Sequence, residues 1–171
     1  MTSSTTSASP LIVLGIDPGF DRMGWAVGRV ELGEPVDQLG YGCVQTNSTD
    51  SIDRRYVQLT RHLQDLIDRF RPAELAIESV FFSKNTRTAL RVSEARGVII
   101  GRCLDNRLAM FEYTPTQIKQ AVAGHGRADK QAVTKMVCTL LGLATPPQSD
   151  DAVDALAVLL THSTARTMVL V

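Results

Sequence analysis

The sequence has too few cysteines for a disulfide framework. Its three cysteines, Cys43, Cys103 and Cys138, are odd in number and widely spaced, which fits neither paired disulfides nor the Cys-x-x-Cys motif of a zinc site. No apolar run approaches the roughly 20 residues that a membrane-spanning helix requires. We therefore expect a cytoplasmic protein with reduced cysteines and no membrane partner.

The N-terminus lacks the features of a targeting segment. Residues 1–10 are rich in Ser and Thr and contain neither an Arg nor an apolar core, which excludes a signal or transit peptide and predicts a disordered tail. A chain of 171 residues is long enough for one substantial core and too short for two. We expect a single domain over residues 11–165, followed by a C-terminal tail over residues 166–171.

The chain also has no net charge, but its charges are segregated. Ten of the 18 Lys and Arg residues, and only four of the 18 Asp and Glu residues, lie between Lys84 and Lys135. Such a basic region can face a polyanion such as nucleic acid. Charge alone is explained equally well by solvated helix surfaces without a partner.

Hydrophobic periodicity and turn signals predict five strands and five helices. Strands are expected at residues 11–17, 23–31, 36–46, 75–78 and 108–113, and helices at about 52–70, 86–106, from 115 onward, 129–141 and 150–163. This order predicts an α/β fold with a mixed five-stranded sheet, in which three antiparallel strands are followed by two parallel ones. Helices are expected to cover both faces of the sheet.

Four acidic residues occupy positions where folding does not require a charge. Asp17 and Glu78 each end an apolar strand, where burial of a carboxylate is unfavourable unless a cation compensates it. Asp151 and Asp154 begin the last helix and, being three residues apart, share one face. Taken separately, this pair could be ordinary helix-start acids and Asp17 a turn residue. Glu78 has no comparable capping role.

A divalent metal ion would explain all four acids together. Hard oxygen ligands without paired His or Cys select Mg²⁺, with Mn²⁺ as a substitute, and two such ions suit phosphodiester hydrolysis. We expect Asp17 to bridge two ions, Glu78 to hold one of them, and Asp151 with Asp154 to hold the other. Asp150 is adjacent to Asp151, so either acid could face the metal. The Asp-x-x-Asp spacing favours Asp151. A nuclease would account for both the acids and the basic region.

Several motifs, in this order, resemble those of the bacterial RuvC family of Holliday-junction resolvases. They are GIDPG at 15–19, AIE at 76–78, SEARG at 93–97, QIKQ at 117–120, GRADK at 126–130 and DAVDALA at 151–157. The resemblance covers about residues 11–163. It implies a ribonuclease H-like fold and Mg²⁺-dependent, symmetrical cleavage of two strands of a four-way DNA junction in recombination and repair. It further implies a catalytic site formed by Asp17, Glu78, Asp151 and Asp154, a nucleoid-associated homodimer, and a branch-migration complex of the RuvA/RuvB type as partner.

Candidate DNA contacts surround the four acids. Phe81 follows Glu78 closely, so its ring could stack on an unpaired base. The basic candidates for phosphate contacts are Lys84, Arg87, Lys119, Arg127 and Lys130. Of these, Lys119 and Lys130 match family lysines near the scissile strand. A role for His125, between two glycines, stays open.

A row of small residues is the candidate dimer contact. Ala89, Ser93, Gly97 and Gly101 are spaced four apart on one predicted helix, which allows another helix to approach closely. That helix could belong to the same domain or to a second subunit. A C₂ dimer would match the approximate two-fold symmetry of a four-way junction.

Two other functions are compatible with parts of the sequence. Actin-like ATPases also begin with a strand, an Asp and a Gly turn, but this chain lacks a second Gly-rich phosphate loop and is short for that two-lobed fold. A non-catalytic nucleic-acid-binding module on the same scaffold would not need all four acids.

Overall fold

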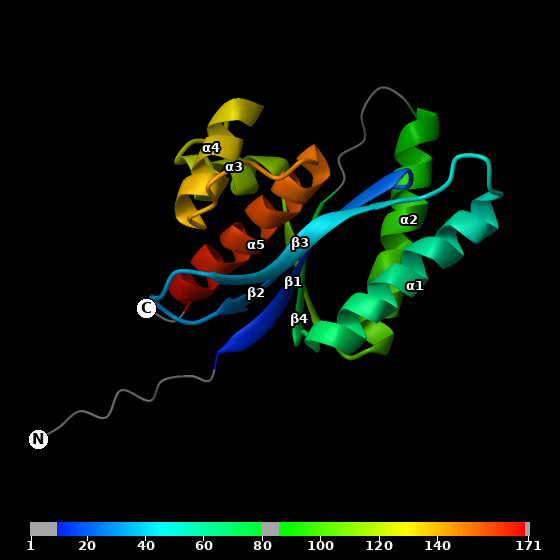
Figure 1. The fold of residues 1–171 in the computed structure, drawn as a ribbon, viewed down its shortest axis with the longest axis horizontal. Helices are drawn as coiled ribbons and strands as arrows, with labels where there is room; N and C mark the ends of the chain where they lie inside the picture. Colours follow the sequence, from blue (N-terminus) through cyan, green and yellow to red (C-terminus); the bar gives the residue numbers. More distant parts are fainter. Residues whose placement is uncertain (1–9, 80–85, 170–171) are drawn as a thin grey trace, which may run out of the picture.

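The centre of the protein is a mixed five-stranded sheet (Figure 1). The computed structural model describes residues 10–79 and 86–169, without the side chains of residues 86–88 and 169. The strand order is β3-β2-β1-β4-β5. β1 pairs antiparallel with β2, β2 antiparallel with β3, and β4 parallel with both β1 and β5. The strand bounds are Leu11–Asp17 (β1), Arg22–Val30 (β2), Asp37–Gln45 (β3), Glu74–Glu78 (β4) and Ala109–Tyr113 (β5).

Helices cover both faces of this sheet, as predicted. Figure 1 shows α1 and α2 on one side and α3, α4 and α5 on the other. The helix bounds are Ile52–Phe70 (α1), Thr86–Asp105 (α2), Pro115–Ala123 (α3), Lys130–Leu140 (α4) and Asp150–Val169 (α5). Except at the end of α5, these bounds lie within a residue of those expected from the sequence. No helix in the described part of the chain is long and apolar enough to cross a membrane.

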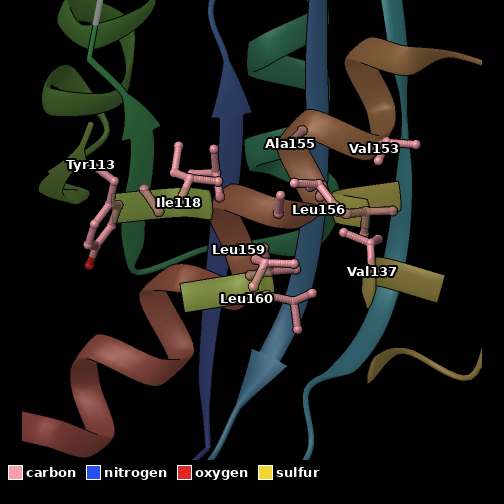
Figure 2. Close-up of a cluster of buried hydrophobic side chains, with 14 of the residues drawn as sticks. Tyr113, Ile118, Val137, Val153, Ala155, Leu156, Leu159 and Leu160 are labelled. Atoms are coloured by element: carbon pink, nitrogen blue, oxygen red, sulfur yellow. The ribbon is translucent and has the colours of Figure 1, made fainter. Parts of the chain in front are cut away.

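Two hydrophobic cores lie on opposite faces of the sheet. On the first face α5 packs against β1, α3 and α4 through buried residues that include Val13, Ile118, Val137, Leu156 and Leu159 (Figure 2). On the second face Leu14 and Ile16 of β1 lie in a core that also contains residues of α1 and α2. The apolar run of β1 is therefore buried on both sides, as its continuous hydrophobicity indicates.

A glycine allows α5 to lie directly on the central strand. A Cβ atom at Gly15 would come within 2.8 Å of the carbonyl oxygen of Ala155, closer than carbon and oxygen normally approach. Because α5 crosses β1 at this point, its first turn lies near the end of β1. The acids at the start of α5 are thereby brought toward Asp17.

The final helix is longer than predicted. It extends to Val169 rather than ending near residue 163, so residues 166–169 are helical and not part of a C-terminal tail. The added turn is anchored by an ion pair between Arg166 and Glu74 of β4, and Glu74 also accepts a 2.6 Å hydrogen bond from Nε2 of His162, which lies just before this turn. The tail expected over residues 1–10 lies outside the described residues, apart from Pro10.

Candidate active site

The four predicted acids meet at one end of the sheet. Asp17 ends β1 and Glu78 ends β4, and these strands are parallel neighbours with Ile16 opposite Ile77. The two carboxylates therefore lie at the same sheet edge. Asp151 and Asp154 come from the first turns of α5.

A second close backbone contact places α5 against β2. Gly24 is the register partner of Asp17, and a Cβ atom at Gly24 would overlap the carbonyl oxygen of Asp151. Only glycine permits this approach. Together with the contact at Gly15, it fixes where the start of α5 lies relative to Asp17.

The carboxylates of this group perturb one another electrostatically. Burial, with repulsion from Glu78, Asp154 and Asp151, raises the pKa of Asp17 to about 7. Burial and repulsion from Asp154 likewise raise the pKa of Glu78 to about 7, and burial also raises the pKa of Asp154. The acids are thus close enough to interact and are not fully compensated by cations of the protein.

A pocket of about 240 Å³ opens between these elements. Glu78 and Asp154 line it together with Lys119 of α3 and Lys130 of α4, and its remaining walls are apolar. A larger groove of about 810 Å³ runs along α4 and the loop before α5, and Lys130 lines both spaces. The smaller pocket is the candidate reaction centre because two of the interacting carboxylates, Glu78 and Asp154, line it.

Asp150 and Asp151 have different surroundings. Asp150 is 75% exposed and pairs with Lys130 at 3.0 Å, a lysine that also lies 3.7 Å from Asp154. Asp151 is 17% exposed, and it, rather than Asp150, contributes to the raised pKa of Asp17. This difference agrees with the Asp-x-x-Asp spacing in favouring Asp151.

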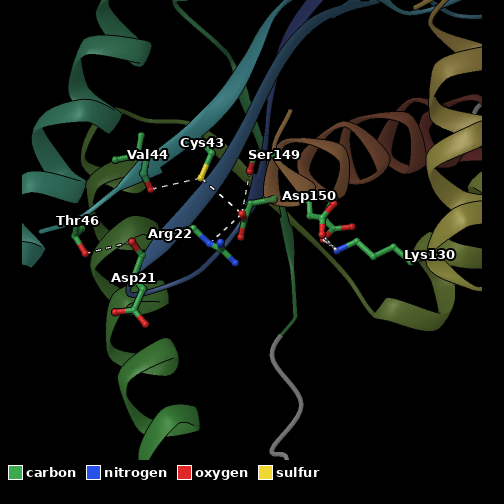
Figure 3. Close-up of polar contacts among 10 residues, drawn as sticks. Asp21, Arg22, Cys43, Val44, Thr46, Lys130, Ser149 and Asp150 are labelled. Carbon is green, nitrogen blue, oxygen red and sulfur yellow. Dashed lines mark hydrogen bonds and ion pairs between the residues drawn. The ribbon is translucent and has the colours of Figure 1, made fainter. Parts of the chain in front are cut away.

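The Asp151 side chain is engaged by groups outside the pocket. Its Oδ2 lies 3.2 Å from Arg22 Nε and accepts a 3.0 Å hydrogen bond from Ser149 Oγ (Figure 3). Within residues 10–79 and 86–169, no three His, Cys, Asp or Glu side chains are arranged to hold one ion. The acids therefore lie in one region, but the described side chains are not arranged as a complete set of metal ligands.

The chemistry of this donor set nevertheless fits a divalent metal. Its candidate ligands are carboxylates, which suit Mg²⁺ and Mn²⁺. Three of these carboxylates, Asp17, Glu78 and Asp154, carry raised pKa values because burial and repulsion disfavour their ionised forms. A bound cation would relieve this penalty.

Three of the predicted DNA contacts have described side chains. Lys119 and Lys130 line the acidic pocket, whereas Arg127 is exposed between α3 and α4. Phe81 and Lys84 lie outside the described residues. The remaining candidate, Arg87, lies in the first turn of α2, where side chains are not described.

The two glycines of the row of small residues on α2 are exposed, whereas Ala89 is buried and Ser93 is half-buried. An added Cβ atom at Gly97 or at Gly101 would meet no described atom within 4 Å. Leu90 and Leu104, which lie on the same helix face, are 57% and 50% exposed. The alternative that this row packs only within its own domain is therefore wrong for the two glycines.

Two arginines near the site were not identified from the sequence. Arg22 contacts Asp151, as described above. Arg55 is buried on α1, donates a 2.9 Å hydrogen bond to Thr46 Oγ1, and stacks 3.8 Å from the ring centre of Phe20. It also pairs with Asp21, so it fixes the turn that follows Asp17. No motif marks either arginine, since both resemble ordinary surface charges.

Comparison with known proteins gives consistent results. A sequence model of the family described as crossover junction endodeoxyribonuclease RuvC matches residues 13–162. The crossover junction endodeoxyribonuclease RuvC of Caldicellulosiruptor saccharolyticus is 44% identical over 158 residues, which cover 92% of this chain and 95% of that protein. A structure of Thermus thermophilus RuvC in complex with a Holliday junction substrate has a TM-score of 0.87 and 33% identity, and covers 92% of this chain and 96% of that one. A yeast mitochondrial Holliday junction resolvase, at 14% identity, a TM-score of 0.61 and coverage of 91% and 81%, shares the fold.

Proposed function

The chain belongs to the RuvC family of crossover junction endodeoxyribonucleases, and we propose that Asp17, Glu78, Asp151 and Asp154 are its catalytic acids. Its sheet is of the ribonuclease H-like type, and its activity is endonucleolytic resolution of Holliday junctions in recombination and repair. The observation that carries the assignment of the site is electrostatic. Burial and acids from two other segments, Glu78 of β4 and the pair Asp151 and Asp154 of α5, raise the pKa of Asp17 at one end of the sheet.

The acids are proposed to hold the metal that this class of nuclease requires. We assign two Mg²⁺ ions to each site, with Mn²⁺ as a substitute. Asp17 would be shared between the ions, Glu78 would hold one, and Asp151 with Asp154 the other. Bound metal activates a water molecule and stabilises the leaving oxygen of the phosphodiester.

The lysines of the pocket act on the substrate directly. Lys119 and Lys130 line the same space as Glu78 and Asp154, where a phosphate would otherwise be repelled by the carboxylates. Their proposed roles are to position the scissile phosphate and to stabilise the negative charge that develops during cleavage. Arg127, Phe81, Lys84 and Arg87 are proposed as further DNA contacts around this centre.

A homodimer formed through α2 would place two such sites on one junction. Leu90, Gly97, Gly101 and Leu104 form one exposed face of α2, and exposed apolar surface interleaved with glycines allows close helix packing. A two-fold axis through this face would relate the two nicks. We further propose a cytoplasmic, nucleoid-associated role beside a branch-migration complex of the RuvA/RuvB type.

The decisive experiment uses a synthetic four-way DNA junction with each arm labelled in turn. The wild-type protein should nick two opposite strands at symmetrical positions in Mg²⁺ and none in EDTA. Asp17→Asn should abolish nicking and leave junction binding intact, because it removes a metal ligand without changing the basic residues. Asp65→Asn, which alters an exposed acid of α1, is the matched control and should nick normally. Asymmetrical nicking, or nicking by Asp17→Asn at the wild-type rate, would contradict the proposal.

A further inference from the structure

Asp151 is held by three groups from three different segments. Arg22 begins β2, Cys43 lies in β3, and Ser149 precedes α5. All three approach the same carboxylate oxygen, Oδ2, at 3.2 Å from Arg22 Nε, 3.7 Å from Cys43 Sγ and 3.0 Å from Ser149 Oγ. Figure 3 shows these labelled side chains converging, with Lys130 and Asp150 forming a separate pair. This oxygen is therefore surrounded by donors outside the pocket.

The backbone fixes the position of Asp151 but not the direction of its side chain. The contact with Gly24 locks the main chain of residue 151 against β2. Arg22 lies two residues before Gly24 on that strand, and Cys43 is the register partner of Gly24. Asp17 is the partner of Gly24 on the other side. The carboxylate of Asp151 thus lies between the cation Arg22 on one side and the acid Asp17 on the other.

The two partners of the ion pair differ in exposure. The side chain of Arg22 is 60% exposed, whereas that of Asp151 is 17% exposed. When the pair breaks, the guanidinium can be hydrated at little cost, whereas the more buried carboxylate then needs another cation. Arg22 is consequently the partner that can leave.

We propose that Arg22 is a displaceable counter-ion, which binds Asp151 until a divalent cation replaces it. Arg22 compensates the charge of Asp151 in the metal-free protein and keeps its Oδ2 away from the other acids. The metal must compete with Arg22 for this oxygen, so Arg22 lowers the metal affinity of the free enzyme. This inference rests on the proposed function, because it takes Asp151 as a metal ligand.

A permanent structural ion pair is the competing explanation. Under that explanation Arg22 only ties β2 to the start of α5, and its removal would lower stability without increasing metal affinity. The two explanations therefore predict different changes in a binding constant that can be measured without DNA and without catalysis.

The test is a Mn²⁺ titration of the full-length protein in which free Mn²⁺ is measured by electron paramagnetic resonance. Arg22→Gln should lower the Kd for Mn²⁺ roughly two- to fivefold, the range expected for loss of an ion pair with one exposed partner. Arg22→Lys, which keeps the charge but not the guanidinium geometry, should lie between Arg22→Gln and wild type. Arg29→Gln is the matched control, because Arg29 also lies on β2 and pairs with Asp37 at 3.1 Å. It should leave the Kd unchanged.

A double-mutant comparison separates a direct contact from a general effect of charge. In an Asp151→Asn background, Arg22→Gln should no longer change the Kd, since the contested ligand is gone. An unchanged or higher Kd in Arg22→Gln, or the same decrease in both backgrounds, would overturn the proposal. So would a wild-type Kd in Asp151→Asn alone. Failure of the proposed function would instead appear as an absence of junction nicking by wild-type protein in Mg²⁺.

Discussion

Replacing the central carboxylate should stabilise the metal-free protein while it abolishes cleavage. Asp17 is buried beside other acids, and its pKa is raised from 3.8 to about 7. At pH 8 the folded protein therefore holds an ionised group that its surroundings disfavour. Asp17→Asn removes the charge and keeps nearly the same shape.

The expected gain follows from the size of the pKa change. A carboxyl group whose pKa rises from 3.8 to about 7 on folding destabilises the ionised native state by about 4 kcal/mol. The Asn amide must still be removed from water, so we expect a net gain of about 2 kcal/mol. For a protein of this length, that gain corresponds to a rise in Tm of about 4–8 °C.

The sign of the pH dependence provides a second check. Between pH 4 and pH 7 the carboxyl group of Asp17 binds more protons in the folded protein than in the unfolded chain, because its pKa is higher in the folded state. The contribution of Asp17 to the stability of the metal-free wild type must then fall as pH rises through this interval. Asp17→Asn removes this contribution, so its advantage should be small near pH 4 and largest at pH 8.

The assay is thermal unfolding in EDTA at several pH values, followed by the same series in Mg²⁺. Glu78→Gln should behave like Asp17→Asn, since the pKa of Glu78 is also raised to about 7. Asp65→Asn should match the wild type throughout. Mg²⁺ should stabilise the wild type at pH 8 and stabilise Asp17→Asn much less. A lower Tm for Asp17→Asn than for wild type at pH 8 in EDTA would refute the reasoning.

Three further predictions concern other parts of the molecule. Arg55→Met should lower the free energy of unfolding by about 2 kcal/mol in urea titrations, because it removes the buried hydrogen bond to Thr46 and the guanidinium stacked on Phe20, whereas Arg54→Met at the neighbouring exposed position should have little effect. Gly101→Arg should convert the proposed dimer into monomers in sedimentation experiments without unfolding the chain, since an added Cβ atom there meets no described atom within 4 Å; an unchanged dimer would exclude this face. Lys130→Gln should reduce the single-turnover cleavage rate roughly 10²-fold at saturating junction, and an unchanged rate would remove this lysine from the proposed mechanism.

The sheet and its helices could be predicted because their residues follow a simple pattern of burial. β1 before Asp17, and β4 between Glu74 and Glu78, are continuously apolar and lie between two helical layers. The apolar residues of α1 instead recur with the period of a helix that is buried on one side. The end of α5 was predicted too early because its last turns depend on a distant partner. Glu74, 92 residues before Arg166, forms an ion pair with that part of the helix, and periodicity within the helix carries no information about such a contact.

The acids were identifiable for the same physical reason. Asp17 and Glu78 interrupt apolar strands, so their cost in folding free energy is visible in the sequence itself. Phe81, Lys84 and Arg87 remain predictions, as do the metal and dimer assignments. Each of these predictions concerns a contact with a bound ion, with DNA or with a second subunit.

Arg22 shows why a local pattern could not complete the site. An exposed arginine at the start of a strand is normally solvated, and nothing in its neighbourhood in the sequence distinguishes it from Arg29 on the same strand. Its significance arises only because Gly24 lets α5 approach β2 and so brings Asp151 within 3.2 Å of the guanidinium. The same close approach that brings the acids together also places Arg22 beside Asp151, where we propose that it competes with the metal. A fold that assembles carboxylates at this density needs such compensation to remain stable before its cofactor binds.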